Sequence, residues 1–104
     1  MYVPQAHKIR VMVVGQDARA HALAWKIAQS PLAAAVFCVP GNAGTALEPD
    51  VGNLGIPLDD PEAIVRSARR QEIGLMVVSP EALLVAGLAD RARQVGIPVF
   101  GPSA

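Results

Sequence analysis

The stretch AAVFCVPGNAGTALEP, residues 34–49, decides the fold because an uninterrupted apolar run leads directly into a glycine-rich loop. Residues 34–39 have the length and composition of a strand that is buried on both faces. Gly41 and Gly44 have no Cβ, so the loop that follows can bring bare backbone close to a ligand. A plain turn uses the same residue types, so a binding loop and a turn that only shapes the strand end both remain open.

The rest of the chain alternates similar apolar runs with capped helices. Further strands are expected at residues 8–14, 53–56, 74–78 and 97–100, and helices at 19–29, 60–71 and 79–95. Pro61 and Pro80 each follow a capping residue and precede a glutamate, which is typical of a helix start. This order predicts one three-layer, Rossmann-like α/β domain with a parallel sheet of four or five strands. Residues 1–8 are expected to form a lead-in segment, and residues 9–104 the domain.

Burial patterns follow from the helical period. We expect an apolar face on the first helix and another on the last: Ala20, Leu23, Ala24 and Ile27, and Leu84, Leu88, Ala92 and Val95. Pro98 cannot donate to a ladder, which predicts an edge strand or a position near the strand start.

Composition excludes several functional classes. The chain has 104 residues, of which 52% are hydrophobic, and its formal net charge is zero, which argues against non-specific nucleic-acid binding. The single cysteine, Cys38, excludes an internal disulfide and a cysteine-cluster metal site, and we interpret it as a small buried hydrophobe. No apolar run approaches membrane-spanning length and residues 1–8 lack the core of a signal peptide, so a cytoplasmic location without a membrane partner is expected.

In a parallel sheet, ligands bind outside the carboxyl ends of the strands. Three loops are expected at that edge: residues 15–19, 40–45 and 79–83. The informative residues of the sequence should therefore lie close together.

Two pairs of polar residues elsewhere have structural interpretations that we favour. His21 lies four residues before Trp25, so the two rings can touch along one helix face. Asp59 and Asp60 resemble a catalytic pair, but a turn residue followed by an N-cap explains them better.

Arg66, Arg69 and Arg70 form a basic stripe on one expected helix. We interpret the stripe by default as a solvated helix face, and a docking surface is the more specific alternative. The sequence contains neither a dinucleotide-binding Gly-x-Gly-x-x-Gly fingerprint nor a Walker-type phosphate loop.

Several segments carry a resemblance to a known family. They are HALAWK (residues 21–26), PGNAGTALEP (40–49), PEA (80–82), LVAG (84–87) and FGP (100–102). Together they resemble the N-terminal domain of phosphoribosylamine–glycine ligase, also called glycinamide ribonucleotide synthetase, of the ATP-grasp superfamily. The similarity runs from about Lys8 to Ser103.

The resemblance implies a pre-ATP-grasp fold and a place in purine biosynthesis, where the family joins glycine to phosphoribosylamine at the expense of ATP. It implies that this domain helps to hold a phosphoribosyl substrate and contributes no catalytic or metal-binding residue. The residues carried over as substrate-binding are Gly15, Arg19, Pro40, Gly41, Asn42, Gly44, Thr45, Pro80 and Glu81. No cofactor is expected in this chain, and ATP and Mg are expected only in a full-length ligase or in a separate ATP-grasp subunit.

Two of these residues keep an alternative role. Arg19 can bind phosphate through its guanidinium fork or be a solvated surface residue. Glu81 can pair with a substrate amine or complement the positive end of a helix.

The first loop departs from the family pattern. The family typically has Gly-x-Gly-Gly-Arg-Glu-His where residues 15–21 read GQDARAH, so Asp17 and Ala18 replace glycines and Ala20 replaces glutamate. A carboxylate at Asp17 should repel a phosphate. In the third loop, Ser79 begins a stretch that starts with glycine in the family.

Two functions of different class follow. The chain is either the substrate-binding N domain of a split or truncated ligase, not catalytic alone, or a non-catalytic regulatory or protein-interaction module that has lost ligand binding.

Overall fold

The computed structural model describes residues 8–41, 44, 50–79 and 87–101. The strands are β1 (Ile9–Gly15), β2 (Ala33–Pro40), β3 (Val51–Asn53), β4 (Leu75–Val78) and β5 (Val99–Phe100). The helices are α1 (Ala18–Ala28), α3 (Pro61–Arg70) and α4 (Leu88–Gln94). The strands form one parallel sheet in the order β3-β2-β1-β4-β5, which confirms the predicted fold class.

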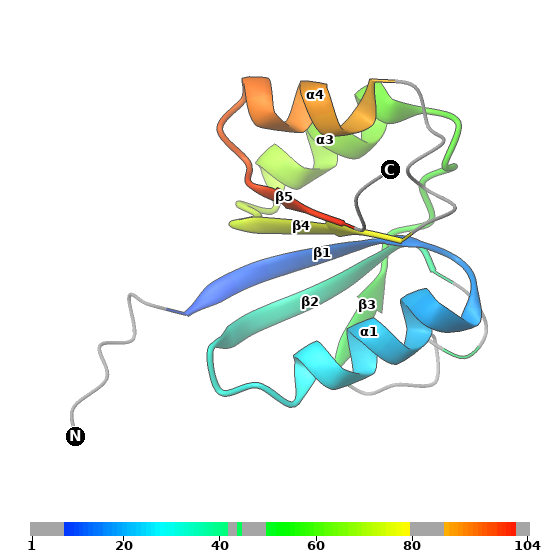
Figure 1. The fold of residues 1–104 in the computed structure, drawn as a ribbon, viewed down its shortest axis with the longest axis vertical. Coiled ribbons are helices and arrows are strands. Elements are labelled where there is room, and N and C mark those ends of the chain that lie inside the picture. The colour runs from blue at the N-terminus through cyan, green and yellow to red at the C-terminus, as the bar shows by residue number, and fades with distance from the viewer. Residues whose placement is uncertain (1–7, 42–43, 45–49, 80–86, 102–104) are drawn as a thin grey trace.

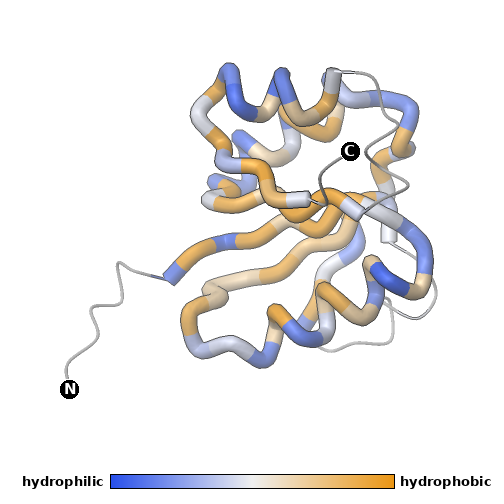
Figure 2. Tube along the Cα trace, viewed as in Figure 1, coloured by the Kyte–Doolittle hydropathy of each residue, from blue (hydrophilic) through white to orange (hydrophobic). Residues whose placement is uncertain are grey.

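Helices cover both faces of this sheet. Figure 1 shows α1 against one face, with α3 and α4 side by side against the other. The apolar segments run through the strands and the polar ones lie along the outer turns of the helices (Figure 2). No helix within the described residues is long and apolar enough to span a membrane.

The alternation of side chains along each strand divides the core in two. Met12 and Val14 of β1 face α3 and α4, where they join Ile64 and Leu88 in the larger cluster. The intervening Val13 joins Cys38 and the alanines of α1 in the smaller cluster. Each fully buried large aliphatic side chain contributes about 1.5–3 kcal/mol, so the two clusters fix the position of β1 at the centre of the sheet.

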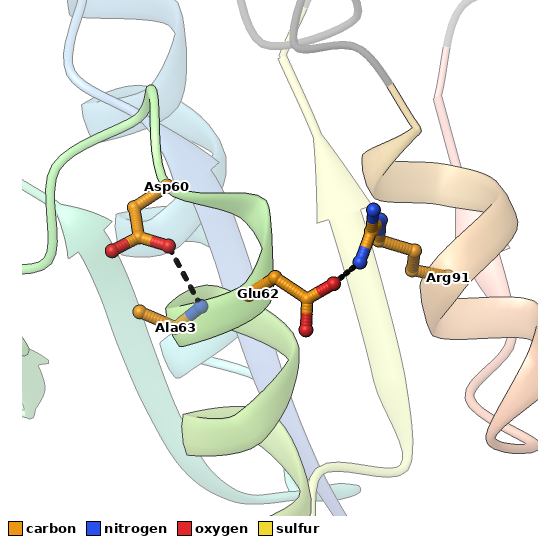
Figure 3. Close-up of polar contacts among 4 residues, drawn as sticks. All are labelled: Asp60, Glu62, Ala63 and Arg91. Carbon is orange, nitrogen blue, oxygen red and sulfur yellow. Dashed lines mark hydrogen bonds and ion pairs between the residues drawn. The ribbon is translucent and has the colours of Figure 1, made fainter.

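The starts of α1 and α3 follow the capping rules. Asp17 caps α1 by accepting a hydrogen bond from the backbone N–H of Ala20, 2.9 Å away. Asp60 caps α3 in the same way through Ala63, at 3.1 Å, with Pro61 in the first turn (Figure 3). The interpretation of Asp60 as an N-cap is therefore confirmed.

At the amino edge of the sheet, Arg10 ties β1 to the end of α3. Its guanidinium donates from Nε to the backbone carbonyl of Gln71 and from an Nη nitrogen to the side-chain oxygen of Gln71. It also lies 5.4 Å from the ring centre of Phe37 on β2. The half-buried Arg10 side chain therefore links β1, β2 and the end of α3 at the amino edge of the sheet.

The predicted bounds of the third strand were wrong. The third strand spans residues 51–53 rather than 53–56, because pairing with β2 ends at Asn53 and the chain then turns at Gly55, whose φ is +67°. The last helix is described only from Leu88, after Gly87 with φ +77°, and the predicted start near residues 79–81 falls mostly outside the described residues.

Two predicted core positions were also wrong. Val95 is 41% exposed because it is the C-cap of α4 rather than part of its buried stripe. Leu23 is 37% exposed because Ala20 and Ala24, four residues apart, form the buried face of α1. The edge-strand prediction for Pro98 is confirmed: β5 lies at the end of the sheet and begins at Val99.

Candidate functional site

The strand order creates a topological switch point between β1 and β4. From β1 the chain continues to β2 on one side, whereas from β4 it continues to β5 on the opposite side. The connections therefore diverge beyond the carboxyl ends of these two neighbouring strands. Open α/β sheets bind ligands at this place.

Gly15 lies at the carboxyl end of β1, directly between its two neighbours. It pairs with Pro40 of β2, and on the other side the backbone N–H of Ser79 donates to the carbonyl of Val14 at 2.9 Å. A Cβ on Gly15 would come within 2.8 Å of the Ser79 Cβ and 2.9 Å of the Ala20 Cβ. Because carbon atoms cannot approach so closely, the packing of β1, β4 and α1 requires glycine here.

Ser79 is the most unusual polar residue of this edge. It is completely buried, and its Oγ has no hydrogen-bond partner in the part of the chain that the structure describes. An unpaired buried hydroxyl costs about 1–3 kcal/mol. From the sequence we interpreted Ser79 only as a helix cap, although a polar residue directly after an apolar strand was a usable signal.

The start of α1 presents a carboxylate rather than free backbone. Oδ1 of Asp17 accepts from the N–H of Ala20, and so occupies the position that an anion takes at a helix N-terminus. Arg19 is exposed in the first turn of the same helix. The first loop can therefore present the guanidinium of Arg19 to a ligand, beside a helix start that the Asp17 carboxylate already caps.

The second loop leaves β2 through Gly41, whose φ is +83°. A Cβ on Gly41 would overlap the side chain of Asn53, at the end of β3. Asn53 therefore lies against this loop and brings an amide to the carboxyl edge. The sequence prediction missed it because it placed Asn53 at the start of the third strand, whereas Asn53 is the last residue of β3.

Part of the predicted convergence of loops falls within the described residues. Gly15 and Pro40 are the paired last residues of β1 and β2, Gly41 follows Pro40, and Gly44 is helical and half-buried. The remaining predicted residues, Asn42, Thr45, Pro80 and Glu81, lie outside the described residues.

The other candidates of the sequence do not join this edge. Cys38 is fully buried in the smaller core cluster, and burial raises the pKa of its thiol to about 11, which confirms its interpretation as a buried hydrophobe. His21 and Trp25 both line a shallow hollow of about 290 Å³ on the outside of α1. Among the described residues, no three His, Cys, Asp or Glu side chains gather closely enough to hold a metal ion.

Comparison with known proteins gives the site its context. The family model for the phosphoribosylglycinamide synthetase N domain matches residues 9–104. The chain belongs to this family. Over 94 residues, or 90% of its length, it is 52% identical to the phosphoribosylamine–glycine ligase of Allochromatium vinosum. It is 50% identical to the enzymes of Haemophilus influenzae and Escherichia coli K12 over 91% and 92% of its length.

The match covers a small part of those enzymes. The chain spans 22% of the length of each of these ligases. The resemblance seen in the sequence is thus confirmed as similarity to the N-terminal region of a purine-biosynthetic ligase. Whatever the other four fifths of such an enzyme supply is not part of this domain.

Proposed function

We propose that this N domain binds a phosphoribosyl ligand at the carboxyl edge of its sheet and is not catalytic alone. In this proposal it is a pre-ATP-grasp domain that acts in the cytoplasm. ATP and Mg belong to further domains of a ligase or to a separate ATP-grasp subunit. The family names a ligase that joins glycine to phosphoribosylamine, and the domain would hold the ribose phosphate during that reaction.

The observation that carries the proposal is the unpaired hydroxyl of Ser79 at the switch point. A buried polar group without a partner is unfavourable unless something else satisfies it. Gly15 and Gly41 border the same edge, and side chains there would collide with neighbouring residues. Bare backbone beside a buried hydroxyl suits a ligand that carries both hydroxyl and phosphate groups.

Calorimetric titration with glycinamide ribonucleotide, a stable phosphoribosyl compound, tests this proposal. We expect saturable binding that weakens at least about tenfold in Ser79→Ala, because a hydrogen bond to a charged group contributes about 1.5–3 kcal/mol. Ser30→Ala is the matched control, since Ser30 lies between α1 and β2 at the opposite edge, where its Oγ accepts from Leu32. Binding that is equal in the parent and in Ser79→Ala would remove Ser79 from the site.

Catalysis is tested separately by the release of ADP from Mg-ATP in the presence of phosphoribosylamine and glycine. We expect no turnover by the purified 104-residue chain and turnover only when ATP-grasp domains are added. Turnover by the chain alone would contradict the assignment of ATP chemistry to other domains.

The capped start of α1 favours the second candidate function, a regulatory or protein-interaction module that has lost its ligand. Asp17 holds an N–H that could otherwise face an anion, and its charge repels phosphate. If neither the parent nor a variant without this carboxylate binds glycinamide ribonucleotide, the second function is supported instead.

A further inference from the structure

The groove between α3 and α4 is a second candidate binding surface, on the face of the sheet opposite α1. It has a volume of about 370 Å³. The lining residues are Glu62, Val65, Arg66 and Arg69 from α3, with Arg91, Gln94 and Val95 from α4 and its end. It is formed by helix side chains and shares none of the residues that define the sheet edge.

Positive charge is concentrated in this groove. Three arginines and one glutamate line it, although the whole chain has nine basic and nine acidic residues and no net charge. Glu62 pairs with Arg91 across the groove, so that one charge of each sign is compensated (Figure 3). Two positive charges, those of Arg66 and Arg69, are left over.

Arg66 and Arg69 are both exposed, and within the described ranges neither side chain has an ion-pair or hydrogen-bond partner. They are three residues apart on α3, which places their Cβ atoms about 5–6 Å from each other on one side of the helix. Arginine binds carboxylates through a rigid, two-pronged fork of donors. The pair is therefore spaced to receive two carboxylates of one segment.

We propose that this groove docks an acidic segment of a partner protein. In an extended segment, side chains on one face repeat about every 6.6–6.8 Å, close to the separation of the two arginines. The half-exposed Val95 offers an apolar contact for the methylene groups of such side chains. A pocket for a small ligand encloses its polar groups in a buried setting, whereas the charged groups here are exposed.

Nucleic acid fits this surface less well. The three arginines occupy one groove on a chain without net charge. Single-stranded nucleic acid is typically bound by a longer basic track with aromatic side chains on which bases stack. No aromatic residue lines this groove among the described residues.

The test uses a fluorescein-labelled peptide in which Glu alternates with Ser, with a Gln-Ser peptide of equal length as its control. Anisotropy titration of the whole chain should show binding of the Glu peptide only, weakening as salt is added. We expect Arg66→Gln with Arg69→Gln to weaken binding at least about tenfold, because both forks are lost. Arg70→Gln with Arg93→Gln also removes two positive charges, one on α3 and one on α4, from residues that do not line the groove, and should change affinity by less than about twofold.

Equal losses in the two double variants would show a general charge effect and overturn the proposal. So would equal binding of the Glu and Gln peptides. Stronger binding of a single-stranded oligonucleotide would assign the surface to nucleic acid instead. Sedimentation of the chain alone covers a further outcome: self-association abolished by the Arg66 and Arg69 changes would make a second copy the occupant and would also overturn the proposal.

Discussion

Replacing Asp17 and Ala18 with glycine should lower the stability of the domain and raise its affinity for glycinamide ribonucleotide. The Asp17 carboxylate accepts from Ala20 at 2.9 Å and caps α1. Glycine at an N-cap costs only a few tenths of a kcal/mol relative to aspartate, and Ala→Gly in a helix costs up to about 1 kcal/mol. We therefore expect the double variant to lose about 1 kcal/mol of the free energy of unfolding, as measured by urea denaturation.

The expected gain in binding is at least as large. Two unit charges 4 Å apart repel by about 1 kcal/mol in water and by about 4 kcal/mol at a typical protein surface. Because Asp17 is half-buried and salt screens part of the repulsion, the lower part of this range applies. About 1.4 kcal/mol corresponds to a tenfold change, so glycinamide ribonucleotide should bind about tenfold more tightly to the double variant at fixed salt.

Asp17→Asn separates charge from loop geometry. Asparagine caps helices as well as aspartate does, so this variant should keep the stability of the parent and show the electrostatic part of the gain alone. Equal or weaker binding in both variants would refute the reasoning, because it would show that the first loop does not limit the site.

Three further predictions concern the scaffold. Burial raises the pKa of the Cys38 thiol from 9.0 to about 11. The stabilisation that comes from burying the neutral thiol is therefore complete below pH 9 and is lost as the pH rises through 11, which lowers the free energy of unfolding by about 3 kcal/mol. Cys38→Ala should lack that part of the pH dependence of urea unfolding, and identical pH profiles would contradict it. Gly15→Ala should cost about 3 kcal/mol, measured by thermal unfolding, because the new Cβ meets Ser79 and the φ of +156° is rarely adopted by other residues; a loss below 1 kcal/mol would mean that β1 and β4 separate easily. Arg10→Lys should cost about 1–2 kcal/mol in denaturant unfolding, since lysine cannot make both contacts with Gln71, and unchanged stability would show that the amino edge does not depend on them.

The sequence predicted the sheet well because its signals are local. Apolar runs and the residues that flank them located four of the five strands closely, and Asp60 with Pro61 located the start of α3. The third strand was misplaced because Leu54 and Ile56 are apolar and pack on the core after the strand has ended. Burial against neighbouring elements does not require pairing, and a hydrophobic pattern cannot separate the two.

The candidate site was predictable in its position but not in its contacts. The carboxyl-edge rule brought Gly15, Pro40 and Gly41 together without any structure. The contact of Asn53 with Gly41 and the burial of Ser79 both depend on which strands are neighbours in the sheet. No single segment of the sequence determines the strand order. Asp17 caps α1 because the conformation of the loop brings its carboxylate to the N–H of Ala20, and the sequence of the loop does not specify that conformation.

The packing of the carboxyl edge separates residues kept for shape from residues that need a ligand. Gly15 and Gly41 are required by their neighbours whether or not anything binds, so their presence cannot distinguish the two candidate functions. Ser79 differs, because an alanine in its place would lose no hydrogen bond seen in the described residues and would remove an unfavourable buried hydroxyl. If the domain bound nothing, Ser79→Ala should leave stability unchanged or raise it, with no other consequence. A variant that is as stable as the parent but weaker in binding therefore identifies a hydroxyl retained for a ligand, and this one comparison decides between a working substrate domain and a scaffold that has lost its ligand.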